Sequence, residues 1–198
     1  MDSKPTISDL RDGMPFLGGH LWLDLLNSTP ILAGIEQDLL ATPEQFARWL
    51  VAAGLPLPEQ SAADQARRTL VALRQRLRAA FDEMRATGAV SKTAAYAVNL
   101  LLAQARIELR LEVTASGAQL VETFEPGAGG PAATVAQDFA RFAATHPAAQ
   151  HRLKVCANPA CNMVFFDSGK NATRRWCSMA LCGNREKIKR YRKRKATP

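Results

Sequence analysis

The four cysteines of this chain lie near its C-terminal end, in two pairs with the same internal spacing. Four residues separate Cys156 from Cys161, four separate Cys177 from Cys182, and fifteen residues lie between the pairs. Two such pairs around a short insert are typical of a structural zinc site, in which four thiolates surround one Zn²⁺ at about 2.3 Å. The sequence therefore predicts one zinc ion held by Cys156, Cys161, Cys177 and Cys182.

Two other uses of four cysteines remain open at this point. Disulfide bonds would need an oxidising compartment, and nothing in the sequence indicates one. An iron–sulfur cluster also takes four cysteines, but usually with shorter spacings than these. Zinc is favoured further because the last 47 residues hold few large apolar side chains, so that a metal would replace the missing core.

The charge of the chain changes sign where the cysteine region begins. Residues 152–198 contain 13 Lys or Arg but only Asp167 and Glu186 as acids, a formal charge of +11, whereas residues 1–151 carry −3. A charge step that coincides with a cysteine cluster indicates a domain boundary near Pro147 to His151. We expect an N-terminal domain over residues 1–148 and a zinc finger over residues 149–198.

The first 148 residues have the composition of a globular, mostly helical domain. The chain is 47% hydrophobic and 22% charged, which excludes a disordered or collagen-like protein. Apolar periodicity and capping residues predict helices in five places, and alternating residues around Ser116 and Gly117 predict one β-hairpin. The expected helices are a short one near 21–26, then 43–53, 59–87, 91–105 and 134–144, and the expected strands are 107–114 and 119–125.

The cysteine region is expected to form a small treble-clef-like zinc finger that ends in a basic helix, which makes the whole chain an α+β protein. Residues 163–166 are β-prone, and a helix is predicted to begin near Cys177 or Ser178 and to run through Lys195. Four residues at helical spacing form a narrow stripe that is expected to pack on the finger. The stripe consists of Leu181, Asn184, Ile188 and Tyr191.

A basic surface of this kind needs an anionic partner, and the phosphates of nucleic acid are the obvious one. A solvated tail, an acidic protein or a membrane surface are the competing interpretations, but a metal-anchored helix favours nucleic acid. Charge alone does not separate DNA from RNA, so an RNA-binding or ribosome-associated module is the alternative. The residues predicted to contact nucleic acid are Arg174, Arg175, Asn184, Arg185, Lys187, Lys189, Arg190, Arg192, Lys193 and Arg194.

The N-terminal domain contains few residue patterns that are typical of a catalytic or binding site. His20, after two glycines and before Asp24, is the one residue that we single out as a candidate ligand-binding residue, although such a histidine is more often structural. An enzyme with a site around His20 and Asp24 is a further alternative, and it predicts a deep polar pocket there. No glycine-rich phosphate loop or nucleophile elbow is present, and we expect a protein that is not an enzyme.

Short motifs in both parts resemble a known family. The run from Trp176 to Arg185, with Cys182, Gly183, Asn184 and Arg185 in succession, resembles the CGNR zinc finger, and residues 156–161 look like its first knuckle. The segment from Gly18 through Thr29, with residues 42–44, is similar to the opening of the ABATE domain that often precedes this finger. The resemblance implies a bacterial transcriptional regulator whose four cysteines bind zinc and whose finger contacts DNA.

These patterns together define the expected setting of the protein. No apolar run approaches the roughly 18 residues that a membrane helix needs, and residues 1–17 do not resemble a signal peptide. We expect a cytoplasmic protein that binds DNA and no membrane. Its N-terminal domain would sense a small-molecule effector or pair with a second copy as a homodimer.

Overall fold

The computed structural model describes residues 10–195, without the side chains of Arg190, Lys193 and Arg194. About half of the chain is helical, and small two-stranded hairpins make up the sheet structure, as expected for the α+β class. The helices are α1 (Leu21–Leu26), α2 (Pro43–Ala53), α3 (Gln60–Thr87), α4 (Lys92–Leu102), α5 (Gly130–Thr145) and α6 (Asn184–Lys195). The hairpins pair β1 (Leu10–Arg11) with β2 (Met14–Pro15), β3 (Ile31–Leu32) with β4 (Ile35–Glu36), β5 (Arg106–Thr114) with β6 (Gly117–Glu125), and β7 (Leu153–Val155) with β8 (Val164–Phe166).

Local signals fix the ends of the helices. Thr42 and Gln45 form a reciprocal capping box at the start of α2, and Gly54 ends that helix with φ 72°, so the predicted range is confirmed at both ends. Helix α4 begins after Ser91 as predicted but ends at Leu102 rather than near residue 105. Helix α5 begins at Gly130, four residues earlier than predicted. Pro131 lies in its first turn, where a proline is compatible with a helix.

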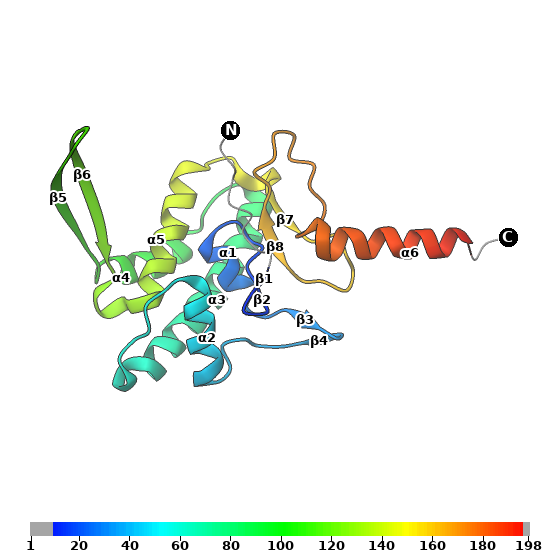
Figure 1. Cartoon of the computed structure of the whole chain (residues 1–198), viewed down its shortest axis with the longest axis horizontal. Helices are drawn as coiled ribbons and strands as arrows, with labels where there is room; N and C mark the ends of the chain where they lie inside the picture. The colour runs from blue at the N-terminus through cyan, green and yellow to red at the C-terminus, as the bar shows by residue number, and fades with distance from the viewer. Residues whose placement is uncertain (1–9, 196–198) are drawn as a thin grey trace.

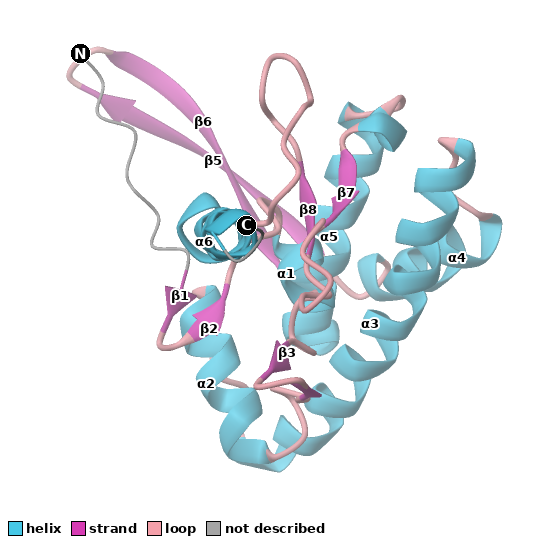
Figure 2. Ribbon diagram, turned by 90° about the vertical axis from the view of Figure 1, so that its right-hand side faces the viewer, coloured by secondary structure: helices cyan, strands magenta, loops and turns pink. Residues whose placement is uncertain are grey.

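The core is built around the short helix α1. Trp22 is fully buried and packs against the rings of Phe81 on α3 and of Phe139 and Phe142 on α5, with centroids 5.2 to 6.2 Å apart. Leu23, like Trp22, has no exposed surface. Helix α1 is therefore enclosed by the rest of the body, which is the arrangement that Figure 2 shows.

The same core continues into the cysteine region. Leu153 of β7 and Val164 and Phe166 of β8 belong to the apolar cluster formed by helices α1 to α5. Strand β7 and the four strands β1 to β4 were not predicted, because each has only two or three residues. The domain ranges 1–148 and 149–198 stay predictions, since one core spans the position that separates them.

Two elements project from the body at opposite ends of the molecule. The β5–β6 hairpin extends from the left of Figure 1, and α6 extends from the right, along the longest axis of the chain. The predicted hairpin is confirmed, with strands one or two residues longer than expected. None of the helices in the described residues combines the length and the apolar character needed to cross a bilayer.

Candidate metal centre and nucleic-acid interface

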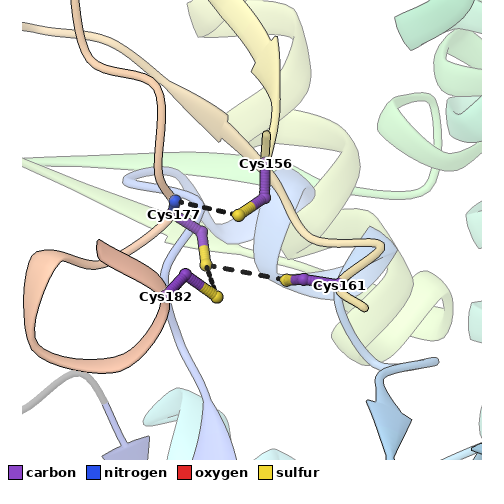
Figure 3. Close-up of side chains that lie close together, drawn as sticks. All are labelled: Cys156, Cys161, Cys177 and Cys182. Carbon is purple, nitrogen blue, oxygen red and sulfur yellow. Dashed lines mark hydrogen bonds between the residues drawn. The ribbon is translucent and has the colours of Figure 1, made fainter. Parts of the chain in front are cut away.

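The four cysteines converge on one point although they come from two separate segments. Cys156 and Cys161 lie on the connection between β7 and β8, whereas Cys177 and Cys182 flank the start of the C-terminal helical segment, and Figure 3 shows all four side chains turned toward one another. All four Sγ atoms lie within 4.8 Å of one another, and none forms a disulfide. The convergence is the arrangement that the spacing of the cysteines predicts for a metal site.

The sulfur distances fit a zinc ion. Four sulfurs at about 2.3 Å from the centre of a tetrahedron lie about 3.8 Å from one another. The Sγ atoms of Cys161 and Cys177 are 3.8 Å apart, and those of Cys177 and Cys182 are 3.6 Å apart. Three of the four cysteines are buried, so that water would not compete for the position. The four cysteines can therefore hold one zinc ion as a closed, structural site.

Three of the four thiols alter one another's ionisation. Hydrogen bonds from Cys161 and Cys177 lower the pKa of Cys156 to about 2. Donating a hydrogen bond to Cys156 raises the pKa of Cys161 to about 12 and also raises the pKa of Cys177. A thiolate at Cys156 thus disfavours the ionisation of Cys161 and Cys177. A dication at the centre of the cluster would remove this repulsion between thiolates.

A small apolar cluster of its own surrounds the cysteines. Phe165 and Met163 point from β8 and its approach toward the sulfurs, while Val164 and Phe166 point into the main core. Leu17 from the N-terminal part completes this second cluster, and Trp176 and Leu181 pack against it. Strand β8 therefore joins the metal centre to the body, one face to each, as the alternation of a β-strand allows.

An asparagine of the N-terminal part is paired with β8. The Asn27 side-chain amide donates to Val164 O at 2.9 Å and accepts from Val164 N at 2.8 Å. Asn27 is 1% exposed, so that both groups would lose water without this pairing. Asn27 thus bonds to the backbone of Val164 as a residue of a neighbouring strand would, and it holds the β7–β8 hairpin against α1.

A second asparagine, which lies in the cysteine region, bonds to the backbone of the N-terminal part. Asn162, next to Cys161, donates through Nδ2 to Thr29 O at 2.7 Å and accepts through Oδ1 from Ile31 N at 3.1 Å. Neither Asn27 nor Asn162 was singled out from the sequence as a structural link, because their partners lie more than 130 residues away. The only available signal was the presence of Asn27 in the family-like opening segment.

The glycines before α1 allow its close packing. A Cβ at Gly18 would lie 2.5 Å from Leu23 Cβ, and Gly19 has φ 83°, a conformation that side chains disfavour. Gly18 also connects two elements, because its N–H donates to Asp24 Oδ1 at 2.7 Å and its carbonyl accepts from Phe166 N at 2.9 Å. The paired glycines therefore fix the contact between α1 and β8.

His20, the candidate ligand-binding residue, lies in an aromatic group. Its ring meets Phe142 edge-on at 4.7 Å and Phe166 at 5.5 Å, and its Nδ1 is 3.8 Å from Asp138 Oδ1. Within the described residues, the only group of three or more potential metal ligands is the set of four cysteines. The structure places His20 at the junction of α1, α5 and β8, which is a packing position.

Asp24 is buried beside His20, and its carboxylate accepts a hydrogen bond from the backbone N–H of Gly18. Burial away from water raises its pKa to about 7, and Asp138 adds to this effect, while the Gly18 hydrogen bond and the charges of Arg11 and His20 act against it. Only 7% of the residue is exposed. The carboxylate of Asp24 is therefore enclosed by the protein, and the enzyme alternative around His20 and Asp24 stays a prediction.

Arg174, a predicted nucleic-acid contact, makes several contacts with other residues of the finger. Its guanidinium lies 4.4 Å from the centre of the Phe165 ring and donates to the carbonyls of Trp176 and Cys177. Buried Asp167 accepts from the backbone N–H of Arg174 at 2.8 Å and so closes the loop. Arg175 stacks on Trp176 with 5.3 Å between guanidinium and ring centre, and its side chain is exposed.

The C-terminal helical segment begins at the metal centre. Ser178 caps it by accepting from Leu181 N, a π-helical turn over Met179–Gly183 carries Cys182, and α6 follows. The predicted stripe is wrong beyond its first residue. Leu181 packs on the finger, but Asn184 is exposed and Ile188 and Tyr191 are 53% and 56% exposed, because α6 extends past the finger.

The basic side chains of α6 divide into two groups by position. Arg185 lies at the start of the helix, where it is exposed and lines a cavity of about 250 Å³ together with Cys161, Cys177 and Cys182. Lys187, Lys189 and Arg192 are exposed further along the helix. The predicted contacts through the side chains of Arg190, Lys193 and Arg194 lie outside the described part of the chain.

Two family models match this chain. Residues 152–195 match the CGNR zinc finger, and residues 19–146 match ABATE, described as "Putative stress-induced transcription regulator". The ABATE match alone covers well over half of the chain. No curated protein is significantly similar to the chain. Both descriptions are of regulator or zinc-finger type, and neither names an enzyme.

Proposed function

The chain belongs to the ABATE family and carries a CGNR zinc finger, and from this premise we propose that it is a zinc-dependent DNA-binding transcription regulator. The observation that carries the proposal is the position of α6. This helix has eight basic residues and one acidic residue among its twelve, and it begins two residues after Cys182. The bound metal would supply structure rather than chemistry, since it fixes the start of the helix.

The dimensions of α6 suit a groove of duplex DNA. Twelve residues at 1.5 Å each give a helix of about 18 Å, and the major groove is about 12 Å wide. The helix projects from the body instead of packing along it, as Figure 1 shows, so that its sides are open to a ligand. Eight positive charges on such a helix would replace the counterions of several phosphates.

The exposed residues suggest a division of roles along the helix. Asn184 and Arg185 lie at its start and carry side chains that can form paired hydrogen bonds with adenine and guanine, and we assign base contacts to them. Lys187, Lys189 and Arg192 are exposed and would meet phosphates. Arg174 would instead position the loop before Cys177, since its guanidinium is bound to backbone carbonyls.

The decisive experiment is selection of DNA sequences from a random pool by the zinc-loaded protein, with Cys177→Ser as the comparison. An enriched motif that is lost in Cys177→Ser supports a zinc-dependent regulator. No enrichment, or an RNA duplex that competes better than DNA of the same sequence, would favour an RNA-binding module. Binding of a small-molecule effector by the N-terminal part stays a prediction.

A second measurement tests the phosphate contacts directly. If about five phosphates are neutralised, the slope of log affinity against log salt concentration is about −4.5. Replacing both Lys187 and Arg192 by Ala should reduce that slope by about 2 units. Lys92→Ala, at an exposed position of α4, is the matched control and should leave the slope unchanged. A slope near zero in the wild-type protein would contradict the assignment.

A further inference from the structure

The β5–β6 hairpin exposes apolar side chains that a soluble protein normally buries. Strand β5 alternates Ile107, Leu109, Leu111 and Val113 with charged residues, and these four apolar side chains are 59% to 85% exposed. Leu120 on β6 lies directly opposite Leu111 and is 66% exposed. These residues form an exposed apolar strip along β5, and on the same face Glu122 of β6, opposite Leu109, is paired with Arg141 of α5 at 3.0 Å.

The hairpin is also incomplete as a sheet. It has nine paired positions but only two strands, and a two-stranded hairpin is marginally stable in water, whereas three or more strands with an apolar face are stable. Each strand leaves one edge of backbone N–H and C=O groups without a strand partner. Such an edge favours the addition of a further strand.

The charges of β5 indicate which strand is added. Arg106, Glu108, Arg110 and Glu112 alternate in sign along the face opposite the apolar strip. If two copies of β5 pair antiparallel with Leu109 facing itself, Arg106 faces Glu112 of the partner subunit and Glu108 faces Arg110 of the partner subunit. All four charges then meet an opposite charge, and Ile107 lies beside Leu111 of the partner subunit on the apolar face.

The other registers of two β5 strands match fewer charges. Shifting the centre by one residue in either direction places Glu108 or Arg110 opposite itself, which brings like charges together, and a shift by two residues, to Ile107 or Leu111, pairs only two of the four charged residues. Pairing of two β6 strands offers no such match, because Glu122 and Glu125 are the only charged residues of β6 and both are acidic. In the single chain, Arg110 meets Glu108 of its own strand at 3.5 Å, and both side chains are more than half exposed. A pair of this kind is weak.

We infer that the chain forms a homodimer by antiparallel pairing of two β5 strands about Leu109, which produces a four-stranded sheet. The hairpin lies at the opposite end of the molecule from α6, as Figure 1 shows, so that both basic helices stay free in the dimer. The interface does not depend on the proposed DNA binding and is tested separately from it.

The test uses charge variants of the full-length, zinc-loaded chain in sedimentation equilibrium. The wild-type chain of 21.6 kDa should approach twice that mass as its concentration rises. Arg110→Glu and Glu108→Arg each place like charges opposite one another at two symmetry-related positions, and each should weaken dimerisation at least about tenfold. The double variant, with both changes, exchanges the signs and should recover the dimer.

Mixing the two single variants supplies a second test that does not depend on the wild-type chain. An Arg110→Glu chain is complementary to a Glu108→Arg chain in this register, so the mixture should dimerise where neither variant does alone. Neither position faces a charge on the opposite strand of its own hairpin, because Glu108 pairs with Thr123 and Arg110 with Val121. The Glu108–Arg110 contact within β5 is exposed and weak, so folding should change little in the single variants. A monomeric wild type, or a dimer that persists unchanged in both single variants, would overturn the inference.

Discussion

Single polar side chains determine how the metal-binding hairpin is held against the body. Asn27 contacts β8 from α1, and Asn162 contacts the N-terminal part from beside Cys161. Each side-chain amide donates to one backbone carbonyl and accepts from one backbone N–H, so each replaces a backbone partner, and Asn162 also donates to Glu36. The metal centre is therefore connected to the body by specific hydrogen bonds as well as by apolar contacts.

Replacing Asn27 by Asp tests this connection. The change removes the donor to Val164 O and places a negative charge against that carbonyl in a buried position, so we expect a loss of about 2 to 3 kcal/mol in unfolding free energy. That loss corresponds to a fall of about 5–10 °C in Tm. Thermal unfolding of the zinc-loaded protein at pH 7.5 measures it. Asn99→Asp, the same change at an exposed position of α4, should change the Tm little, and equal effects would contradict the role of Asn27.

Asp24 gives the fold a pH dependence of known sign. Its pKa in the folded chain is about 7, above the ordinary value of 3.8, because the carboxyl is buried. The folded state therefore binds the extra proton between about pH 4 and pH 7, and the contribution of Asp24 to stability falls as the pH rises through that range. Above pH 7 the full cost of the buried charge is present.

The variant Asp24→Asn removes this cost while keeping an oxygen acceptor for Gly18 N–H. Relative to wild type, its Tm should be similar near pH 5 and higher at pH 8 by at least about 2 °C, in line with roughly 1 kcal/mol in a chain of this size. The comparison is made at each pH with zinc in excess, so that changes in metal binding affect both proteins equally. A constant difference across the range would show that Asp24 does not titrate.

At the scale of elements, the helices were the most predictable part of the fold. The capping box of Thr42 and Gln45 and the glycine after Ala53 are local signals, and they located α2 at both ends. Strands β1 to β4 and β7 could not be found in the same way, since two or three residues carry no periodicity. The exposure of Ile188 and Tyr191 was also unpredictable, because a stripe along a helix does not reveal how far the helix extends beyond its support.

The two halves of the finger should respond differently to loss of metal. The amides of Val164 and Phe166 bond to Asn27 and Gly18, whereas those of Cys182 and Gly183 bond to Ser178 within the metal-bound turn. Hydrogen exchange after addition of a zinc chelator should keep protection at β8 and lose it at residues 177–183. Protection that persists throughout would show that the metal is not needed, and loss throughout would show that the finger and the core unfold together.

For the whole molecule, the sequence determined the four cysteines of the metal centre and the position of the basic segment. The cysteine spacing defined the four sulfurs, since ligands close in sequence must lie close in space, and the charge step located the basic segment without any knowledge of the fold. These properties depend on short-range spacing and on composition, which folding does not change. The family resemblance came from the same short motifs.

Only the tertiary structure decided how these parts are joined. The sequence predicted a coreless finger, yet Leu153, Val164 and Phe166 place β7 and β8 in the main core, so that metal and body support the finger together. The sequence also left His20 as a ligand candidate, and that role stays a prediction, while the structure places its ring against Phe142 of α5 and Phe166 of β8. Such contacts join residues more than a hundred positions apart, and their formation depends on the relative placement of whole helices and hairpins, which no local pattern contains.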